Sequence, residues 1–486
     1  MDLCDTPIHQ LHQQRLKGEI STMEIAKSVQ ARIERVEPQI KAYLTLTPEA
    51  MLAAAKQADD RLARKESLSP LAGMPIALKD IFCTQGVETT CASRMLKGFV
   101  PPYDATVVSR LNATGYGLTG KTNMDEFAMG SSTENSAFGP TKNPWDVTRV
   151  PGGSSGGTAA AVAAGEALAG LGTDTGGSVR QPAAFTSLVG LKPTYGRVSR
   201  YGMIAFASSL DQAGVMTRDA MDAALLLGAI SGVDARDASC ADQPVPDYAA
   251  GLKGDLKGVK VGLVKEFQQS GLDAEVTRVF QDNLKSLQSL GAELVEVSLP
   301  SLAHALAVYY ILAPCEASSN LGRYDGIRYG HRSGQAQELE EVYRKSREEG
   351  FGPEVKRRII LGTFALSAGY YEAYYNRAMK VRQAMREDFA RAFSQVQLIA
   401  SPASPVPPFK IGEKVNDPIQ MYLMDIFTMP CNLAGLPGVS VPGGFTPSGL
   451  PLGLQLLAEP FREDRLLQAA HAFQQATTYH KERPKL

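Results

Sequence analysis

Two loops rich in glycine and serine, in the middle of the chain, constrain the fold more than any other feature of the sequence. They are Pro151-Gly-Gly-Ser-Ser-Gly-Gly157 and Gly172-Thr-Asp-Thr-Gly-Gly-Ser178. Apolar runs at residues 167–171 and 188–191 lie between and after them, and a disordered linker would lack such runs. We therefore expect a folded core with tight loops over about residues 70–213.

The composition of the two loops suits them to holding an oxygen anion. Glycine adopts positive φ and lets the backbone approach a ligand closely, so that successive N–H groups can converge on one oxygen. Each loop leads into a segment of small residues, 158–164 and 179–184, and helices there would add positive potential near the serines. Ser154 and Ser178 are therefore candidate nucleophiles, although a single loop of this kind is more often only a turn.

A serine nucleophile needs a base, and histidine is the usual one. The chain has 6 histidines, and none lies in the two loops or between them. Gly152-x-Ser154-x-Gly156 matches the nucleophile-elbow pattern, which requires a histidine further along the chain, for example His304 or His471. Neither histidine belongs to a supporting motif, so this remains the second hypothesis.

Lys79 is the better candidate for the base. Ile76, Ala77 and Leu78 precede it and apolar residues follow at 81 and 82, a setting in which a lysine can lose its proton. A neutral lysine can accept a proton from a serine. A lysine at the end of a strand is more often a surface residue with its stem folded over apolar neighbours, and sequence spacing does not show that Lys79 meets the serines.

A phosphate-loop pattern also occurs in the chain. Residues 115–122, Gly-Tyr-Gly-Leu-Thr-Gly-Lys-Thr, satisfy G-x-x-x-x-G-K-[ST] in full and could indicate nucleotide binding. The motif requires a strand before its first glycine, whereas residues 106–113 have a helical pattern and the expected strand, 116–119, lies inside the match. We therefore expect a structural strand and turn here, with nucleotide binding through Gly115 to Thr122 as the alternative.

Helices and strands alternate along the rest of the chain. Ser21 and Glu24 form a capping-box pattern at the start of a helix, with Pro38 expected as its stop. Residues 259–264 have the pattern of a strand and residues 274–290 that of an amphipathic helix. This alternation predicts the α/β class.

No convincing linker or periodic repeat divides the chain. We expect one domain over residues 1–486, with a mainly helical N-terminal segment over about 1–65 before the core at about 70–213. A second helix in that segment is expected from Thr47-Pro48-Glu49.

Composition excludes several classes of function. Lys and Arg number 50 and Asp and Glu 51, so the formal charge of −1 gives no basic field to attract nucleic acid or an anionic membrane. The 6 cysteines are scattered without the spacing of a zinc site or a disulfide framework. The first residues lack the pattern of a signal peptide, and the most apolar stretch, residues 159–171, is too short to span a bilayer. We expect a cytoplasmic protein without a metal.

Taken together, Lys79, Gly-Gly-Ser154-Ser-Gly-Gly and Gly-Gly-Ser178-Val-Arg180-Gln-Pro182 closely resemble the amidase signature family. The resemblance implies one compact α/β domain with a central mixed β-sheet and helices on both faces. It implies that Ser178 is the nucleophile, that Ser154 relays its proton through a cis peptide bond, and that Lys79 is the base. The oxyanion donors that it implies are the backbone N–H groups of Thr175, Gly176, Gly177 and Ser178.

The resemblance continues through residues 120–146, 323–330, 354–375 and 424–442. Over nearly the whole length the chain is similar to the branch of the family that works in tRNA-dependent amidotransferases. In that branch this chain hydrolyses glutamine, and ammonia passes to a B subunit that activates misacylated tRNA with ATP and Mg²⁺, while a small C subunit braces the pair. The resemblance implies no cofactor in this chain and little contact of its own with tRNA.

The same branch implies how glutamine is held. Arg358 and Asp425 would bind its two charged groups, and Tyr309 is a further position carried over. A guanidinium fork suits an α-carboxylate and a carboxylate suits an α-ammonium, although each residue alone could be an ordinary ion-pair partner. The choice of Arg358 over Arg357 rests on the resemblance alone.

Two alternatives stay open from the sequence. The chain could be a stand-alone amidase acting on another carboxamide, or a noncatalytic scaffold that binds a nucleotide through the loop at Gly115. Release of ammonia from glutamine would distinguish a glutaminase from the first alternative, an amidase for another carboxamide. Nucleotide binding by the isolated chain would support the second.

Overall fold

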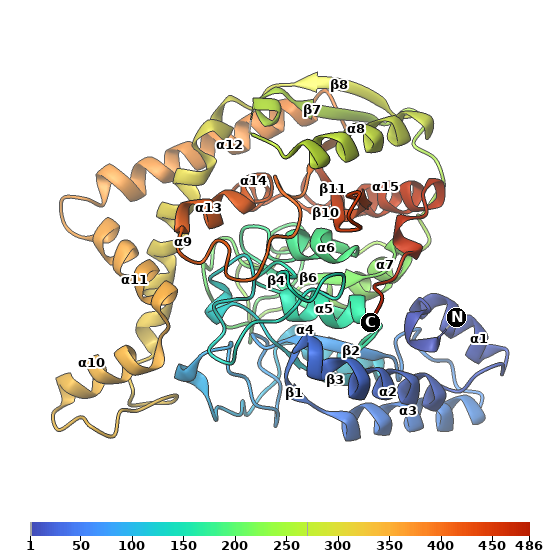
Figure 1. The fold of residues 1–486 in the computed structure, drawn as a ribbon, viewed down its shortest axis with the longest axis horizontal. Helices are drawn as coiled ribbons and strands as arrows, with labels where there is room; N and C mark the ends of the chain where they lie inside the picture. Colours follow the sequence, from blue (N-terminus) through green and yellow to red (C-terminus); the bar gives the residue numbers. More distant parts are fainter. Residues whose placement is uncertain (1, 270) are drawn as a thin grey trace.

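An 11-stranded β-sheet organises the computed structural model, which describes residues 2–269 and 271–486 (Figure 1). The strand order is β1-β3-β2-β4-β6-β5-β10-β11-β9-β7-β8. The strands are β1 (Tyr43–Leu46), β2 (Pro75–Lys79), β3 (Gly117–Thr122), β4 (Ala169–Asp174), β5 (Val189–Lys192), β6 (Gln212–Thr217), β7 (Lys260–Val264), β8 (Glu293–Val297), β9 (Leu398–Pro402), β10 (Gly438–Phe445) and β11 (Pro451–Ala458).

The sheet is mixed, as the resemblance to the amidase signature family implies. β2 pairs in parallel with β3 and β4, and β7 pairs in parallel with β8 and β9. The strands between these two groups, from β4 through β6, β5, β10 and β11 to β9, pair antiparallel. The expected strand at 259–264 is β7, which confirms that prediction to within a residue.

Helices connect the strands and cover the sheet. They are α1 (Ile8–Leu16), α2 (Thr22–Ile40), α3 (Pro48–Ala63), α4 (Thr106–Thr114), α5 (Gly156–Ala164), α6 (Arg180–Thr186), α7 (Ala220–Ile230), α8 (Ala274–Ser289), α9 (Ala305–Asn320), α10 (Leu339–Gly350), α11 (Pro353–Leu366), α12 (Arg377–Phe393), α13 (Pro418–Tyr422), α14 (Met429–Ala434) and α15 (Glu463–Ala476). In Figure 1, α9 to α12 form the left-hand side of the molecule. The helices expected at 274–290 and from Pro48 are present as α8 and α3.

Helices bury both faces of the sheet. Because side chains alternate along each strand, neighbouring residues of one strand belong to different cores. Ile76 and Leu78 of β2 belong to the large hydrophobic core that includes residues of α4 and α7. Ala77, between them, belongs to a separate core made largely by the small residues of α5. The period of two places Lys79 on the same face as Ala77, toward α5 and the loop before it.

The first long helix begins as the sequence predicts. Ser21 Oγ accepts the N–H of Glu24, and the Glu24 carboxylate accepts the N–H of Ser21, which completes the capping box at the start of α2. The N-terminal segment also contributes a strand to the sheet, because Tyr43–Leu46 forms β1 and pairs with β3.

The expectation that Pro38 stops this helix is wrong. Pro38 lies inside α2, which continues to Ile40 and ends at Lys41 in the left-handed region with φ 58°. A proline this close to the end removes only one backbone hydrogen bond, and the last turn is held by the buried side chain of Ile40. The Glu37 carboxylate fixes the exit by accepting the N–H groups of the next two residues after Lys41.

The phosphate-loop pattern forms no phosphate loop. Gly115 is the C-cap of α4 with φ 78°, and residues Gly117–Thr122 form the buried strand β3. Lys121 Nζ donates to the carbonyl of Phe82 and to Thr89 Oγ1, and it lies 3.3 Å from Asp80. The lysine that would bind a phosphate is therefore a buried structural cation, which removes the nucleotide-binding alternative through this loop.

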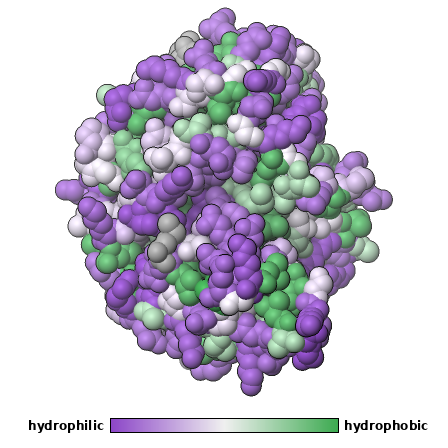
Figure 2. Space-filling model, turned by 90° about the vertical axis from the view of Figure 1, so that its right-hand side faces the viewer, coloured by the Kyte–Doolittle hydropathy of each residue, from purple (hydrophilic) through white to green (hydrophobic). Residues whose placement is uncertain are grey.

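In the described residues no helix is long and apolar enough to cross a bilayer. Figure 2 shows the face that forms the right-hand side of Figure 1, on which hydrophilic residues predominate and apolar residues occur in small groups. The two chain ends meet near this side, where Arg483 Nη2 donates to the carbonyl of Asp5.

Candidate active site

Lys79 stands at the end of β2 and reaches the first glycine–serine loop. Its side chain is fully buried, and its Nζ donates to Ser154 Oγ over 2.7 Å and to Thr173 Oγ1 over 2.8 Å. Thr173 lies on β4, the neighbouring parallel strand, so the sheet itself brings the lysine and its partners together. The contact between Lys79 and Ser154 is the one that sequence spacing does not reveal.

The surroundings of Lys79 favour its neutral form. Burial lowers the pKa of Lys79 from 10.5 to about 7, although the carboxylates of Asp125, Asp174 and Asp211 act in the opposite direction. No carboxylate forms an ion pair with Nζ in the described residues, where its partners are two hydroxyl groups and the Thr173 carbonyl. At neutral pH a substantial fraction of Lys79 is therefore able to accept a proton.

The two serines of the first loop have different surroundings. The Gly153–Ser154 peptide bond is cis, and Ser154 Oγ accepts the Lys79 hydrogen bond. Ser155 Oγ instead donates to the carbonyl of Thr173 over 3.1 Å, and the Ser155 N–H donates to the carbonyl of Ser178 over 3.2 Å. Ser155 thus fastens the two loops together, while Ser154 remains next to the lysine.

The second loop places unused backbone donors beside Ser178. The Gly177 N–H donates to Asp174 Oδ1 over 2.9 Å and is therefore already occupied. Within the described residues, the N–H groups of Thr175, Gly176 and Ser178 find no protein acceptor. These N–H groups are available to a bound oxygen anion, whereas the Gly177 group that the resemblance also implies would have to be shared with Asp174.

The loop needs glycine at two positions for steric reasons. Gly177 has a φ of 141°, and a Cβ there would lie 2.1 Å from Thr428 Oγ1. A Cβ on Gly176 would lie 2.6 Å from the ring of Tyr309. Thr428 Oγ1 also donates to the carbonyl of Gly176 over 2.7 Å, so the loop is clamped on this side. Tyr309 is thereby placed against the oxyanion loop.

A buried ion pair between Arg180 and Asp174 stabilises the loop at residues 172–178. Arg180, on α6, donates to Asp174 through Nε and Nη2 over 3.0 and 2.9 Å, and both side chains are fully buried. Its remaining hydrogens go to Thr428, Asn432 and Gln455. Although burial raises the pKa of Asp174, Arg180 lowers it to about 2, so this carboxylate stays charged. The pair is fully hydrogen-bonded, which a buried charge requires.

Arg358 and Asp425 both lie in buried positions within reach of this region. Arg358 is 3% exposed on α11, and Asp425 is 7% exposed at the end of the short helix η8 (Leu423–Asp425). Arg357, in contrast, has a side chain that is 47% exposed. The structure thus distinguishes the two neighbouring arginines that the sequence leaves equivalent.

Asp425 has one oxygen without a partner. Ser131 Oγ donates to its Oδ2, whereas the buried Oδ1 accepts no hydrogen bond from the described residues. Burial raises the pKa of Asp425 to about 7, although Ser131 and Arg358 act in the opposite direction. The carbonyl of Asp425 accepts the Thr428 N–H over 3.0 Å, and Thr428 Oγ1 donates to the Gly176 carbonyl, so Asp425 is linked to the loop at residues 172–178 through Thr428.

Several residues of the site were missed by sequence reasoning. Asp125 is fully buried, its Oδ2 accepts the N–H of Thr133 over 2.9 Å, and its own N–H donates to the carbonyl of Ser154. Gln181 links the first loop to Ser131, because its Oε1 accepts the Gly153 N–H and its Nε2 donates to the Ser131 carbonyl. Polar residues in an otherwise apolar, glycine-rich stretch were the available signal.

The nucleophile-elbow hypothesis with a distant histidine is wrong. Ser154 has Lys79 as its partner, and neither His304 nor His471 hydrogen-bonds to a serine of the two loops in the described structure. His304 is exposed at the end of a 3₁₀ turn, and His471 lies half-buried on α15. Gly152-x-Ser154-x-Gly156 matched the nucleophile-elbow pattern because loops of glycine and serine share that composition. The strand that precedes the serine of a nucleophile elbow is missing here.

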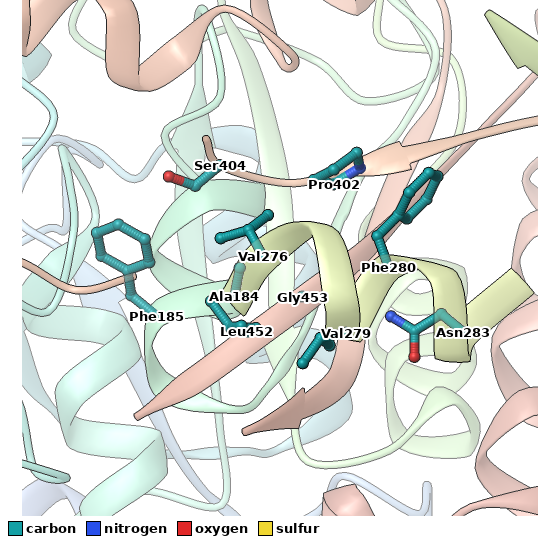
Figure 3. A pocket seen from close by; sticks show the side chains of 10 residues that line it. All are labelled: Ala184, Phe185, Val276, Val279, Phe280, Asn283, Pro402, Ser404, Leu452 and Gly453. Carbon is teal, nitrogen blue, oxygen red and sulfur yellow. The ribbon is translucent and has the colours of Figure 1, made fainter. Parts of the chain in front are cut away.

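The pocket in Figure 3 lies elsewhere. It is enclosed by α6, α8 and β11, and Figure 3 shows mainly apolar side chains around it, among them Phe185, Val276 and Leu452. Asn283 Oδ1 is buried there without a hydrogen-bond partner in the described residues. None of the expected catalytic or glutamine-binding residues lines it. It is a packing gap between layers and no part of the site around Lys79.

Comparison with known proteins accounts for this combination of residues. The family model described as Amidase matches residues 24–467, which is most of the chain and includes the whole site. This chain belongs to the amidase family. Among curated amidase relatives, the A subunit of Glutamyl-tRNA(Gln) amidotransferase from Carboxydothermus hydrogenoformans is 59% identical over 468 residues, covering 96% of each chain.

Solved amidase structures share the fold over the full length. The crystal structure of the A subunit of Glutamyl-tRNA(Gln) amidotransferase from Thermotoga maritima is 41% identical, with a TM-score of 0.82, and the match covers 99% of this chain and 96% of that one. The structure of 6-aminohexanoate cyclic dimer hydrolase is 26% identical, with a TM-score of 0.84, over 100% of this chain and 99% of that one. The amidase fold is thus common to proteins whose names indicate different amides.

Proposed function

We propose that this chain hydrolyses the side-chain carboxamide of free glutamine, with Ser178 as nucleophile, Ser154 as proton relay and Lys79 as base. The observation that carries the proposal is the buried hydrogen bond of 2.7 Å between Lys79 Nζ and Ser154 Oγ. A lysine held neutral by burial, next to a serine rather than a carboxylate, is suited to general-base catalysis.

The reaction follows from these roles. Ser178 Oγ attacks the carboxamide carbon while its proton passes through Ser154 to Lys79. The oxyanion is stabilised by the free N–H groups of Thr175, Gly176 and Ser178, with Gly177 contributing if its hydrogen bond to Asp174 is shared. The proton returns to the leaving nitrogen, ammonia departs, and water then cleaves the glutamyl ester through the same relay. The products are ammonia and glutamate.

Recognition of glutamine is assigned to the charged residues beyond the loop. The α-carboxylate would bind the Arg358 guanidinium, and the α-ammonium would bind Asp425 Oδ1, the oxygen that lacks a partner. Tyr309 would close the site against Gly176. A buried carboxylate with one unused oxygen is costly unless a ligand completes it, which supports a cationic group at this position.

The ammonia needs an acceptor, and the names of the relatives suggest which one. Proteins named as the A subunit of Glutamyl-tRNA(Gln) amidotransferase match this chain from end to end. We infer that the chain is the glutaminase component of a cytoplasmic heterotrimer with B and C subunits. The B subunit would bind ATP, Mg²⁺ and most of the tRNA, and would convert Glu-tRNA(Gln), Asp-tRNA(Asn) or both to the amidated forms.

The test is to measure ammonia and glutamate released from glutamine by the wild-type chain and by variants of the three proposed catalytic positions. The wild-type chain should release ammonia and glutamate in equal amounts, and Ser178→Ala, Ser154→Ala and Lys79→Ala should each remove most of that activity. Because the three act as a unit, the triple variant should be scarcely worse than the worst single one. Additive losses, or an active Ser178→Ala variant, would contradict the assignment.

A further inference from the structure

Glu354 has an unusual number of partners around the arginine proposed to bind glutamine. It lies one helical turn before Arg358 on α11, and its Oε1 accepts Arg358 Nε–H over 2.8 Å. The same oxygen accepts the hydroxyl of Tyr422 over 2.9 Å, and Oε2 pairs with Arg357. The Glu354 side chain is only 11% exposed, so these contacts are partly shielded from water.

Aromatic rings complete the enclosure of the guanidinium. Arg358 Cζ lies 5.4 Å from the ring centroids of both Tyr310 and Tyr422, and 5.6 Å from that of Phe206. Tyr310 and Tyr422 are themselves stacked, with centroids 3.8 Å apart. Rings at this distance attract a cation and limit its rotation. The guanidinium is therefore held by contacts from separate segments of the chain.

This arrangement leaves one edge of the guanidinium unused. Nε is occupied by Glu354, whereas Nη1 and Nη2 hydrogen-bond to no protein group in the described part of the chain. These two nitrogens form the fork that binds a carboxylate through two parallel hydrogen bonds. Against the effect of burial, the Arg358 guanidinium acts to lower the pKa of both Tyr309 and Asp425, so both side chains lie near it.

We propose that Glu354 is a positioning residue which, through Arg358, sets the preference of this site for carboxamides that also carry an α-carboxylate, as glutamine does. This rests on the proposed glutaminase function and goes beyond it in naming what orients the arginine. Glu354 fixes Nε, the rings fix the plane, and the fork is presented without the freedom that a surface arginine has. Preorganisation of this kind strengthens carboxylate binding because less conformational entropy is lost.

An ordinary helix ion pair would account for only part of these contacts. Glu354 lies in the first turn of α11, where a negative charge is favourable, and its pairing with the half-exposed Arg357 is typical of a helix surface. Neither role requires the hydrogen bond to the Tyr422 hydroxyl or a shared oxygen facing Arg358. The contact with Arg357 provides a matched control, because its loss leaves the Arg358 side intact.

The experiment compares two substrates that differ only in the carboxylate. Full-length wild-type chain and the variants Glu354→Ala, Glu354→Gln and Arg357→Gln are assayed for ammonia release from L-glutamine and from 4-aminobutanamide, which retains the amine and carboxamide. Loss of a charge-assisted hydrogen bond predicts that Glu354→Ala raises KM for glutamine about tenfold or more. Its kcat for glutamine and its kcat/KM for 4-aminobutanamide should stay within about twofold of wild type.

The two remaining variants sharpen the result. Glu354→Gln keeps an acceptor for Nε–H and should restore part of the loss, and Arg357→Gln should behave like wild type. Equal losses with both substrates in Glu354→Ala would overturn the proposal in favour of a structural role, and so would a loss in Arg357→Gln that matches it. A wild-type chain without preference for glutamine would overturn the proposed function as well, whereas a wild-type preference that survives in Glu354→Ala overturns only this inference.

Discussion

At the scale of single residues, Lys79 is distinguished by what it lacks. A buried lysine normally pairs with a carboxylate. Lys121, on the neighbouring strand β3, pairs in this way with Asp80. In the described residues Lys79 Nζ donates to the hydroxyl groups of Ser154 and Thr173 and, over 3.5 Å, to the Thr173 carbonyl, and it has no carboxylate partner. The same sheet therefore contains one buried lysine beside a carboxylate and another without one.

Replacing Lys79 by arginine separates charge from basicity. Arginine keeps the positive charge but cannot give up a proton in a protein, so Lys79→Arg should lose about 10²- to 10⁴-fold in kcat, nearly as much as Lys79→Ala. Steady-state ammonia release from glutamine measures this. Retention of more than about a tenth of the activity in Lys79→Arg would leave the lysine with only an electrostatic role.

The pH dependence of kcat/KM should report two groups. Below pH 7 Lys79 is protonated and cannot accept a proton, and Asp425 is protonated and offers no charge to the α-ammonium; both pKa values are near 7. The logarithm of kcat/KM should therefore rise with pH, with a limiting slope of about two on the acid side. Asp425→Asn should reduce that slope to about one while lowering the plateau. A slope of two that persists in Asp425→Asn would contradict the assignment of the second group.

At this scale the sequence indicated which residue types have the chemistry for the site. It could not indicate which of their side chains are in contact. The glycine pattern indicated an oxyanion loop, and the apolar run before Lys79 indicated a neutral base. The hydrogen bond between Lys79 and Ser154 depends on pairing of β2 with β4, which no local pattern specifies. Arg358 and Arg357 differ only by which face of α11 is buried, and Gly177 donates to Asp174 through a turn that its neighbours do not predict.

At the scale of elements, the close packing of α11 on α9 decides where Arg358 lies. Gly362 of α11 faces α9 at Pro314, which lies inside that helix, and a Cβ on Gly362 would lie 1.9 Å from the Pro314 carbonyl oxygen. Backbone cannot give way as a flexible side chain can. The two helices can therefore approach this closely only because position 362 has no side chain.

Gly362→Ala should force the helices apart. We expect a loss of about 1–3 kcal/mol in the free energy of unfolding, despite the better helix propensity of alanine, and a higher KM for glutamine as Arg358 shifts. Gly228→Ala on α7 is the matched control, because a Cβ there meets nothing within 4 Å. It should be neutral or stabilising in the same denaturant titration. Two variants of equal stability would show that the packing of α9 against α11 tolerates the extra carbon.

Element prediction succeeded where local signals agreed and failed where they competed. α8 and β7 followed from periodicity, and α2 began at its capping box. Pro38 failed as a stop because burial of Ile40 outweighed one missing hydrogen bond. Residues 115–122 match the phosphate-loop pattern in sequence. Because Gly115 ends a helix and residues 117–122 form a strand, they do not form a phosphate-binding loop.

At the scale of the whole molecule, charge and fold indicate a division of labour. The net charge of −1 gives no overall basic field to attract a polyanion, and the phosphate-loop pattern is buried in the sheet. A glutaminase acting alone would release ammonia into solvent, which gives a physical reason for coupling to a partner. The order of the 11 strands, in contrast, could not be derived from the sequence, because the pairings join distant segments.

The isolated chain should therefore bind neither tRNA nor ATP. Calorimetric titration at physiological salt should show no micromolar binding of either ligand, and glutamine hydrolysis by the chain alone should be weak. Addition of B and C subunits with ATP and misacylated tRNA should stimulate hydrolysis. Micromolar binding of tRNA or ATP to the isolated chain would show that it carries functions assigned here to its partners.

The central claim is that Ser178, and no other serine of the two loops, carries the glutamyl group. It is tested most directly by treating the full-length chain with an electrophilic glutamine analogue and locating the adduct by peptide mass spectrometry. We expect one adduct per chain, on Ser178, formed more slowly in Lys79→Ala and blocked by excess glutamine. An adduct on Ser154 or Ser155 would contradict it.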